Sequence, residues 1–122
     1  MCGIFFYYGN SLNHKYLEEL FNKIKHRGPD QEGIYISKKK NCGLVNNRLA
    51  IVSPNEKINL PFSKNKNQYL SFNGEIYNHR EIRETLVANN CRHKWIGTSD
   101  TESMVAAMQH WGVQDSIKHF NG

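Results

Sequence analysis

The chain begins with a run of residues that belongs in the interior of a sheet. Residues 4–8 are all aromatic or β-branched, and they lie between Gly3 and Gly9. A run of this length and composition predicts a buried strand bounded by turns. The first residues of the chain are therefore expected to be held in place by a sheet.

Further segments carry strand and helix patterns in alternation. Strands are expected at residues 33–37, 44–52, 69–72 and 91–96, with an irregular crossing over residues 53–68. Helices with an apolar face are expected to begin near Asn13, Asn78 and Ser99, with a shorter helical piece after Gly112. The second and third starts resemble capping boxes, because Glu81 and Glu102 follow three residues later. Strands in pairs with helices between them predict an α+β fold with largely antiparallel sheets.

Length and hydropathy limit the class of protein. At 122 residues the chain has the length of one domain with one core. It lacks an apolar run near the ~18 residues of a membrane span, and no signal or transit peptide is recognisable. We therefore expect a cytoplasmic protein that does not bind membranes.

Charge and cysteine content exclude further classes. The formal charge of +5 would suit nucleic acid, but Lys38 to Lys40 and other lysines lie in polar turns without interleaved aromatic residues. Cys2, Cys42 and Cys91 are odd in number and form no CxxC pair, which argues against disulfides and zinc. We expect reduced thiols, no metal and no nucleic-acid partner.

Cys2 is the first candidate for chemistry. Removal of Met1 would leave a thiol and a free α-amino group on one residue, and an α-amino group with a pKa of ~7.7–8.0 can act as a general base near neutral pH. A small cysteine near an N-terminus can also be a minor hydrophobe. Position alone does not decide between these interpretations.

Asn73 and Gly74 also allow two interpretations. Asn-Gly between apolar runs is typical of a hairpin turn. The same pair could offer a side-chain amide and a backbone N–H to an oxyanion during acyl transfer. Glu75 follows directly, and if the segment is a strand its side chain points to the face opposite Gly74.

Two charged residues lie where an ion needs a partner. Arg48 interrupts an apolar strand, and its planar guanidinium would suit a substrate carboxylate or a nearby acidic side chain. Asp100 lies in the first turn of a predicted helix, where the dipole stabilises it whatever its function. It could equally face a substrate ammonium.

Five motifs follow one another along the chain: Met1–Phe5, His26–Asp30, Arg48–Val52, Asn73–Asn78 and Ser99–Glu102. Together and in this order they resemble the glutaminase domain of asparagine synthetases, which are class II glutamine amidotransferases with an N-terminal nucleophile. The resemblance implies the four-layer α/β/β/α sandwich of N-terminal nucleophile hydrolases with mainly antiparallel sheets, here truncated on its C-terminal side.

The resemblance also implies a mechanism. Cys2, freed of Met1, would attack the side-chain amide of glutamine, while Asn73 and the N–H of Gly74 hold the oxyanion. Ammonia would leave, and water would hydrolyse the resulting thioester to glutamate. By the same resemblance Arg48 would bind the α-carboxylate, Glu75 and Asp100 would hold the α-ammonium, and Leu49 and Ile51 would line the pocket.

The match has departures. Phe6 stands where the family commonly has a small residue, Asn46 and Asn47 precede Arg48 where a histidine is frequent, and Leu60–Pro61 replaces a Gln-Pro pair. None of these removes a proposed catalytic group.

The resemblance covers only the glutaminase part of such enzymes. Residues 1–122 are expected to form a partial glutamine amidotransferase type 2 domain, whose ammonia would pass to a synthetase domain or subunit. We expect no cofactor in this chain, because ATP and Mg²⁺ would be needed only in the missing synthetase domain. A homodimer is left open. The alternative to an active enzyme module is a catalytically inactive remnant that binds glutamine or a partner.

Overall fold

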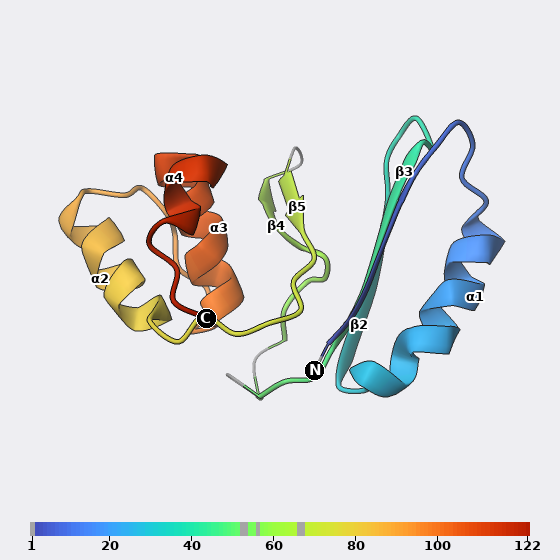
Figure 1. Cartoon of the computed structure of the whole chain (residues 1–122), viewed down its shortest axis with the longest axis horizontal. Helices are drawn as coiled ribbons and strands as arrows, with labels where there is room; N and C mark the ends of the chain where they lie inside the picture. The colour runs from blue at the N-terminus through green and yellow to red at the C-terminus, as the bar shows by residue number, and fades with distance from the viewer. Residues whose placement is uncertain (1, 52–53, 56, 66–67) are drawn as a thin grey trace. The chain divides into compact units, whose positions relative to one another are not determined.

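The structure is a computed structural model that describes residues 2–51, 54–55, 57–65 and 68–122 (Figure 1). The described residues form two compact units, and each is considered by itself. The first lies within residues 1–51 and 57–73, and the second within residues 52–56 and 74–122.

The first unit contains a three-stranded antiparallel sheet. Its strands are β1 (Gly3–Tyr8), β2 (Gln31–Ile36) and β3 (Cys42–Arg48), in the order β1-β3-β2. The register pairs Gly3 with Asn47 and Gln31 with Arg48. The strand at the N-terminus and the antiparallel arrangement are both confirmed.

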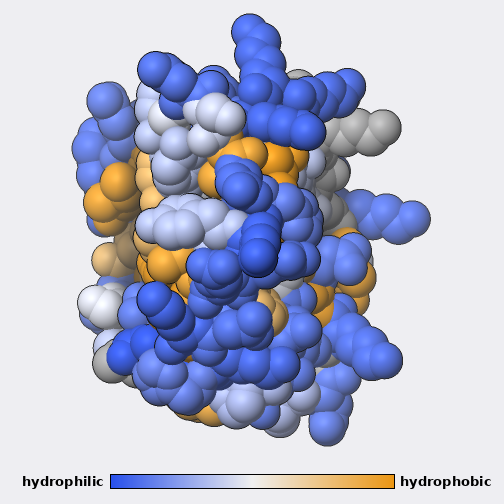
Figure 2. Space-filling view, turned by 90° about the vertical axis from the view of Figure 1, so that its right-hand side faces the viewer, coloured by the Kyte–Doolittle hydropathy of each residue, from blue (hydrophilic) through white to orange (hydrophobic). Residues whose placement is uncertain are grey.

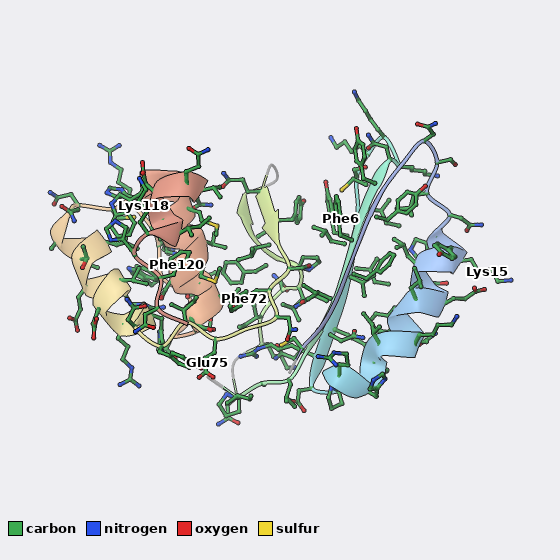
Figure 3. The ribbon with its side chains drawn as sticks, viewed as in Figure 1. Phe6, Lys15, Phe72, Glu75, Lys118 and Phe120 are labelled. Atoms are coloured by element: carbon green, nitrogen blue, oxygen red, sulfur yellow. The ribbon has the colours of Figure 1, made fainter. Side chains whose placement is uncertain are left out.

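Helix α1 (His14–Ile24) covers one face of this sheet, as Figure 1 shows. The Asn13 side chain caps it by accepting the N–H of Lys15 at 2.9 Å. Leu17 and Phe21 are buried against Val45 of β3, and burial of such a side chain contributes about 1.5–3 kcal/mol. The outer side of α1 is mostly hydrophilic (Figure 2), and Lys15 points outward from it (Figure 3).

The opposite face of the sheet is only partly covered. Alternation along β1 places Ile4, Phe6 and Tyr8 there, with 44%, 60% and 74% of their surface exposed. Phe6 points away from α1 in Figure 3. A hairpin of β4 (Phe62–Asn65) and β5 (Gln68–Leu70) contributes Tyr69, whose ring stacks on Tyr35 of β2 with centroids 3.6 Å apart. The chain at Leu60 approaches Gly33 so closely that a Cβ there would lie 1.9 Å from the Leu60 carbonyl oxygen.

The second unit is helical. It contains α2 (His79–Ala88), α3 (Asp100–Trp111) and the short α4 (Val113–Ile117). The oxygen of Ser99 accepts the N–H of Glu102 at 3.3 Å, which confirms the predicted cap of α3. None of the described helices is long and apolar enough to cross a membrane.

Several predicted elements are wrong. Residues 91–96, all described, form no strand: the Cys91 N–H donates to the Leu86 carbonyl at the end of α2, and the Ile96 N–H donates to the Glu102 side chain. The strand predicted over residues 44–52 ends at Arg48, and residues 52 and 53 lie outside the described residues. Asn78 does not cap α2 with its side chain, which instead donates to the His119 carbonyl and accepts the N–H of Asn121. The segment predicted to be irregular contains β4.

Candidate functional site

Cys2 lies directly before β1 and is half-buried. Since Gly3 pairs with Asn47, Cys2 stands beside Arg48 one position further along the sheet. Its sulfur is 3.9 Å from the Leu49 carbonyl oxygen. The Cys2 carbonyl accepts a hydrogen bond from Nε of Arg27 at 3.3 Å. The backbone and the side chain of Cys2 are therefore both held.

Arg48 is the last residue of β3, with 8% of its surface exposed. Its Nη1 donates to Oε1 of Gln31 at 2.9 Å, directly across the β2–β3 ladder. Strand alternation places Arg48 and Gln31 on the face opposite α1, which is also the face of Cys2. A buried guanidinium held on one side by an amide oxygen is suited to bind a carboxylate.

The loop before β2 fixes the chain that follows Arg48. The N–H of Asp30 donates to the Arg48 carbonyl at 3.1 Å, and Oδ2 of Asp30 accepts the N–H of Ala50 at 2.8 Å. Gly28 lies so close that a Cβ there would be 2.2 Å from the Asn47 carbonyl oxygen. This contact explains the Gly in the His26–Asp30 motif. In the segment after Arg48 that is held by Asp30, Leu49 is half-buried and Ile51 is 65% exposed.

Asn73 and Gly74 are both exposed, and the division between the two units falls between them. Residues 71–78, all described, contain no strand. The hairpin interpretation of Asn-Gly is therefore wrong. Asn73 belongs to the first unit with Cys2, Arg48, Leu49 and Ile51, whereas Gly74 belongs to the second with Glu75 and Asp100.

Asp100 organises the start of the second unit. This buried residue is the first of α3, and its Oδ2 accepts the N–H of Ile76 at 3.1 Å. Its Oδ1 accepts the N–H of Thr101 at 2.7 Å. Asp100 is thereby brought next to the segment Gly74–Ile76, which carries Glu75.

Glu102 is the most heavily bonded buried carboxylate that the described residues contain. Its oxygens accept the N–H groups of Ile96 and Gly97, each at 2.8 Å, and the ring of His93 at 3.1 Å. Burial raises the pKa of Glu102, but the two backbone N–H groups and the His93 ring outweigh this and hold it below its ordinary value. Glu102 is therefore charged at neutral pH. The capping-box pattern located this residue but not these partners.

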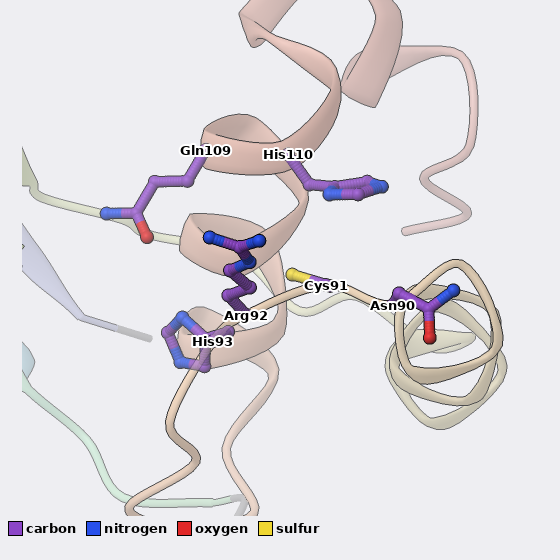
Figure 4. A pocket seen from close by; sticks show the side chains of 6 residues that line it. All are labelled: Asn90, Cys91, Arg92, His93, Gln109 and His110. Carbon is purple, nitrogen blue, oxygen red and sulfur yellow. The ribbon is translucent and has the colours of Figure 1, made fainter.

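A cavity of about 420 Å³ lies in the second unit, and none of the predicted site residues is among those that line it (Figure 4). It is lined by Asn90, Cys91, Arg92, His93, Gln109 and His110. No group of three metal-ligating side chains occurs among the described residues.

A sequence profile described as a glutamine amidotransferase domain matches residues 1–122. The glutamine-hydrolysing asparagine synthetase 2 of Oryza sativa subsp. japonica is 34% identical over 118 residues, which are 93% of this chain and 19% of the rice protein. The glutamine-hydrolysing asparagine synthetase of Triphysaria versicolor is 37% identical over 94 residues, which are 77% of this chain and 15% of that protein. That of Lotus japonicus, number 1, is 43% identical over 68 residues, covering 56% of this chain and 11% of the relative.

The chain thus spans less than a fifth of the length of each of these three relatives. The profile covers the whole sequence, and the first relative matches nearly all of it. This chain belongs to the family of class II glutamine amidotransferase domains.

Proposed function

We propose that the chain hydrolyses glutamine through Cys2 and supplies the ammonia to an asparagine synthetase-like reaction. The observation that carries this proposal is the placement of Cys2, whose sulfur lies 3.9 Å from the carbonyl of the residue that follows Arg48. A nucleophile and a buried guanidinium on one sheet face are suited to act on an amino acid that carries a free carboxylate.

The proposed reaction begins with Met1 removed. The α-amino group of Cys2 takes the thiol proton, and the sulfur attacks the side-chain carbonyl carbon of glutamine. The side-chain amide of Asn73 and the N–H of Gly74 stabilise the oxyanion. The protonated α-amino group of Cys2 returns the proton to the leaving nitrogen as the C–N bond breaks, and ammonia is released. Water then cleaves the thioester, which gives glutamate and restores the thiol.

Substrate binding follows from charge at both ends of glutamine. Arg48 takes the α-carboxylate, and Asp100 and Glu75 take the α-ammonium. Asp100 accepts two backbone N–H groups and, at 3.4 Å, the Thr101 hydroxyl. Since a carboxylate has roughly four acceptor sites, capacity for one ammonium N–H remains. Leu49 and Ile51 line the aliphatic part of the substrate. The reaction requires no metal or cofactor of this chain, and a synthetase domain or subunit, which would use ATP and Mg²⁺, accepts the ammonia.

The sheet of the first unit also supports a proposal about the fold. We propose that it is one layer of the four-layer sandwich of N-terminal nucleophile hydrolases, of which this chain carries part. The support is the exposed apolar row Ile4, Phe6 and Tyr8 on the face opposite α1. A contiguous apolar sheet face of this kind normally packs against another layer.

Ammonia release from glutamine tests the function. The chain with an N-terminus that starts at Cys2, verified by intact mass, should release ammonia and glutamate in equal amounts. Cys2→Ala should reduce the rate at least about 10³-fold, to background, because the nucleophile is gone. Cys91→Ala, which removes another half-buried free thiol, should leave the rate unchanged. Equal rates for Cys2→Ala and the unmodified chain would reject the proposal, and glutamine binding without ammonia release would identify a binding module instead.

A further inference from the structure

We infer that Glu102 is a positioning residue for Asp100, and through it for the ammonium end of the glutamine site. The nature of the ligand rests on the function proposed above. The positioning itself rests only on contacts within the second unit.

The segment before α3 is held by side chains and not by a ladder of backbone bonds. Residues 91–99 are all described and contain neither helix nor strand. Both oxygens of Glu102 reach back to this segment and accept the N–H groups of Ile96 and Gly97. In an ordinary capping box the glutamate would return to the N–H of the N-cap, here Ser99. Glu102 instead accepts the N–H groups two and three residues before Ser99, so it fixes the segment that leads into α3.

Two basic side chains complete the arrangement. Arg83 of α2 donates to the Gly97 carbonyl at 2.7 Å and stacks over the ring of Trp95, with 4.0 Å from Cζ to the ring centroid. Its Nη2 is 3.8 Å from Oε2 of Glu102. Nε2 of His93 donates to Oε1 of the same carboxylate at 3.1 Å. We call Glu102, Arg83 and His93 the Glu102 clamp.

The clamp is connected directly to Asp100. Gly97 is three residues before Asp100, and Ser99 between them caps α3. Movement of residues 96–97 therefore shifts the first turn of the helix, and with it the Asp100 oxygen that accepts the N–H of Ile76. The clamped carboxylate is 1% exposed. Since well-packed apolar residues can replace a buried ion pair without loss of stability, a charged clamp at this place is better explained by the geometry it imposes.

Amide hydrogen exchange tests the positioning without any ligand. In the intact chain, Glu102→Gln should speed exchange at Ile96 or Gly97, because these two N–H groups bind different carboxylate oxygens and one of those oxygens becomes an NH2 donor. It should also speed exchange at Ile76 about tenfold, which is the effect of roughly 1.4 kcal/mol. Glu84→Gln, an exposed site on α2 with the same chemical change, should alter none of these. Unchanged exchange at Ile76, or an equal increase at every amide of the second unit, would overturn the inference.

Calorimetry then tests the consequence for binding, with Cys2→Ala as the background to prevent hydrolysis. The ligands are glutamine and glutaramate, which has the same side-chain amide and carboxylate but no α-ammonium. Glu102→Gln should weaken the binding of glutamine about tenfold and the binding of glutaramate less than about twofold, since only the α-ammonium of glutamine contacts Asp100. Equal weakening of both, or of neither, would overturn the inference.

The two sets of results separate the inference from the function on which it rests. Loss of selectivity in Glu102→Gln together with absent hydrolysis in the unmodified chain would refute the function and keep the positioning. Intact hydrolysis in the unmodified chain, together with equal weakening of the binding of both ligands in Glu102→Gln, would refute the positioning and keep the function. If neither ligand binds, the proposed function fails, and exchange at Ile76 decides the link between Glu102 and Asp100.

Discussion

Replacement of Gly28 by alanine should destabilise the first unit by an amount that follows from one close approach. A Cβ at Gly28 would lie 2.2 Å from the Asn47 carbonyl oxygen and 2.6 Å from the Arg48 carbonyl carbon. These atoms belong to the backbone of the central strand, so no side-chain rotation relieves the overlap. The strand and the loop must separate by about 1 Å, and overpacking of this kind costs about 1–3 kcal/mol.

The net effect on stability includes the unfolded state. Alanine restricts the unfolded chain more than glycine does, and this lower entropy of the unfolded state raises the free energy of unfolding by about 0.4–1 kcal/mol. We therefore expect Gly28→Ala to lower the free energy of unfolding by about 1.3 kcal/mol. For a chain of this size the melting temperature should fall by roughly 5 °C. The glutaminase rate should fall as well, because the displaced backbone carries Arg48.

Gly9→Ala is the matched control. A Cβ at Gly9 would meet the Tyr7 hydroxyl at 2.4 Å, against 2.2 Å for the contact at Gly28, but this atom is the end of a side chain and not backbone. Its free energy of unfolding should change by less than about 0.5 kcal/mol. Thermal melts followed by circular dichroism, with amide exchange of β3 as the local probe, measure both variants. Equal melting temperatures for the two variants would refute the distinction between backbone and side-chain overlap.

Two further predictions concern pH and the exposed sheet face. Because the pKa of Glu102 is lowered on folding, its charged form stabilises the native state at pH values above the ordinary pKa. This contribution to the free energy of unfolding is lost as the pH falls through the lowered pKa. In urea titrations from pH 7 to pH 2, the free energy of unfolding should therefore decrease less with acid for Glu102→Gln than for the unmodified chain. Phe6→Ala should change the free energy of unfolding by less than about 0.5 kcal/mol in this chain, whereas Phe21→Ala, in the core, should cost about 3–5 kcal/mol. In a longer form of the protein, a loss of about 3 kcal/mol for Phe6→Ala would support a second covering sheet, and no loss would contradict it.

The parts of the fold that the sequence predicted are those in which local pattern and burial agree. The apolar run 4–8 became β1, and the spacing of Leu17 and Phe21 became the buried face of α1. Ser99 caps α3 as its spacing with Glu102 indicated. In each case the residues that define the pattern are the residues that make the contact.

The errors arose where distant side chains satisfy the backbone. Alternation over residues 91–96 suggested a strand, but Arg83 and Glu102 bind the backbone at the end of this segment, and neither partner is visible in the local pattern. Asn78 has the spacing of a cap, yet its amide is used by residues 41 and 43 positions later. The charges at Arg48 and Asp100 could be singled out from the sequence. The hydrogen bonds that orient them, from Arg48 to Gln31 and from the Ile76 N–H to Asp100, could not.

The order β1-β3-β2 also bears on synthesis of the chain. The first strand has no sequence neighbour to pair with, since its partner residues lie about 40 positions later, from Gly3 opposite Asn47 to Tyr8 opposite Cys42. At translation rates of about 5–20 residues per second, β1 waits on the order of 2 to 9 seconds for β3 to leave the ribosome. In that interval α1 emerges first and β2 after it, and Leu17 and Phe21 of α1 belong to the core against which Phe5 and Tyr7 pack. The amphipathic helix next to β1 therefore acts as an early cover for a strand that emerges well before its partner.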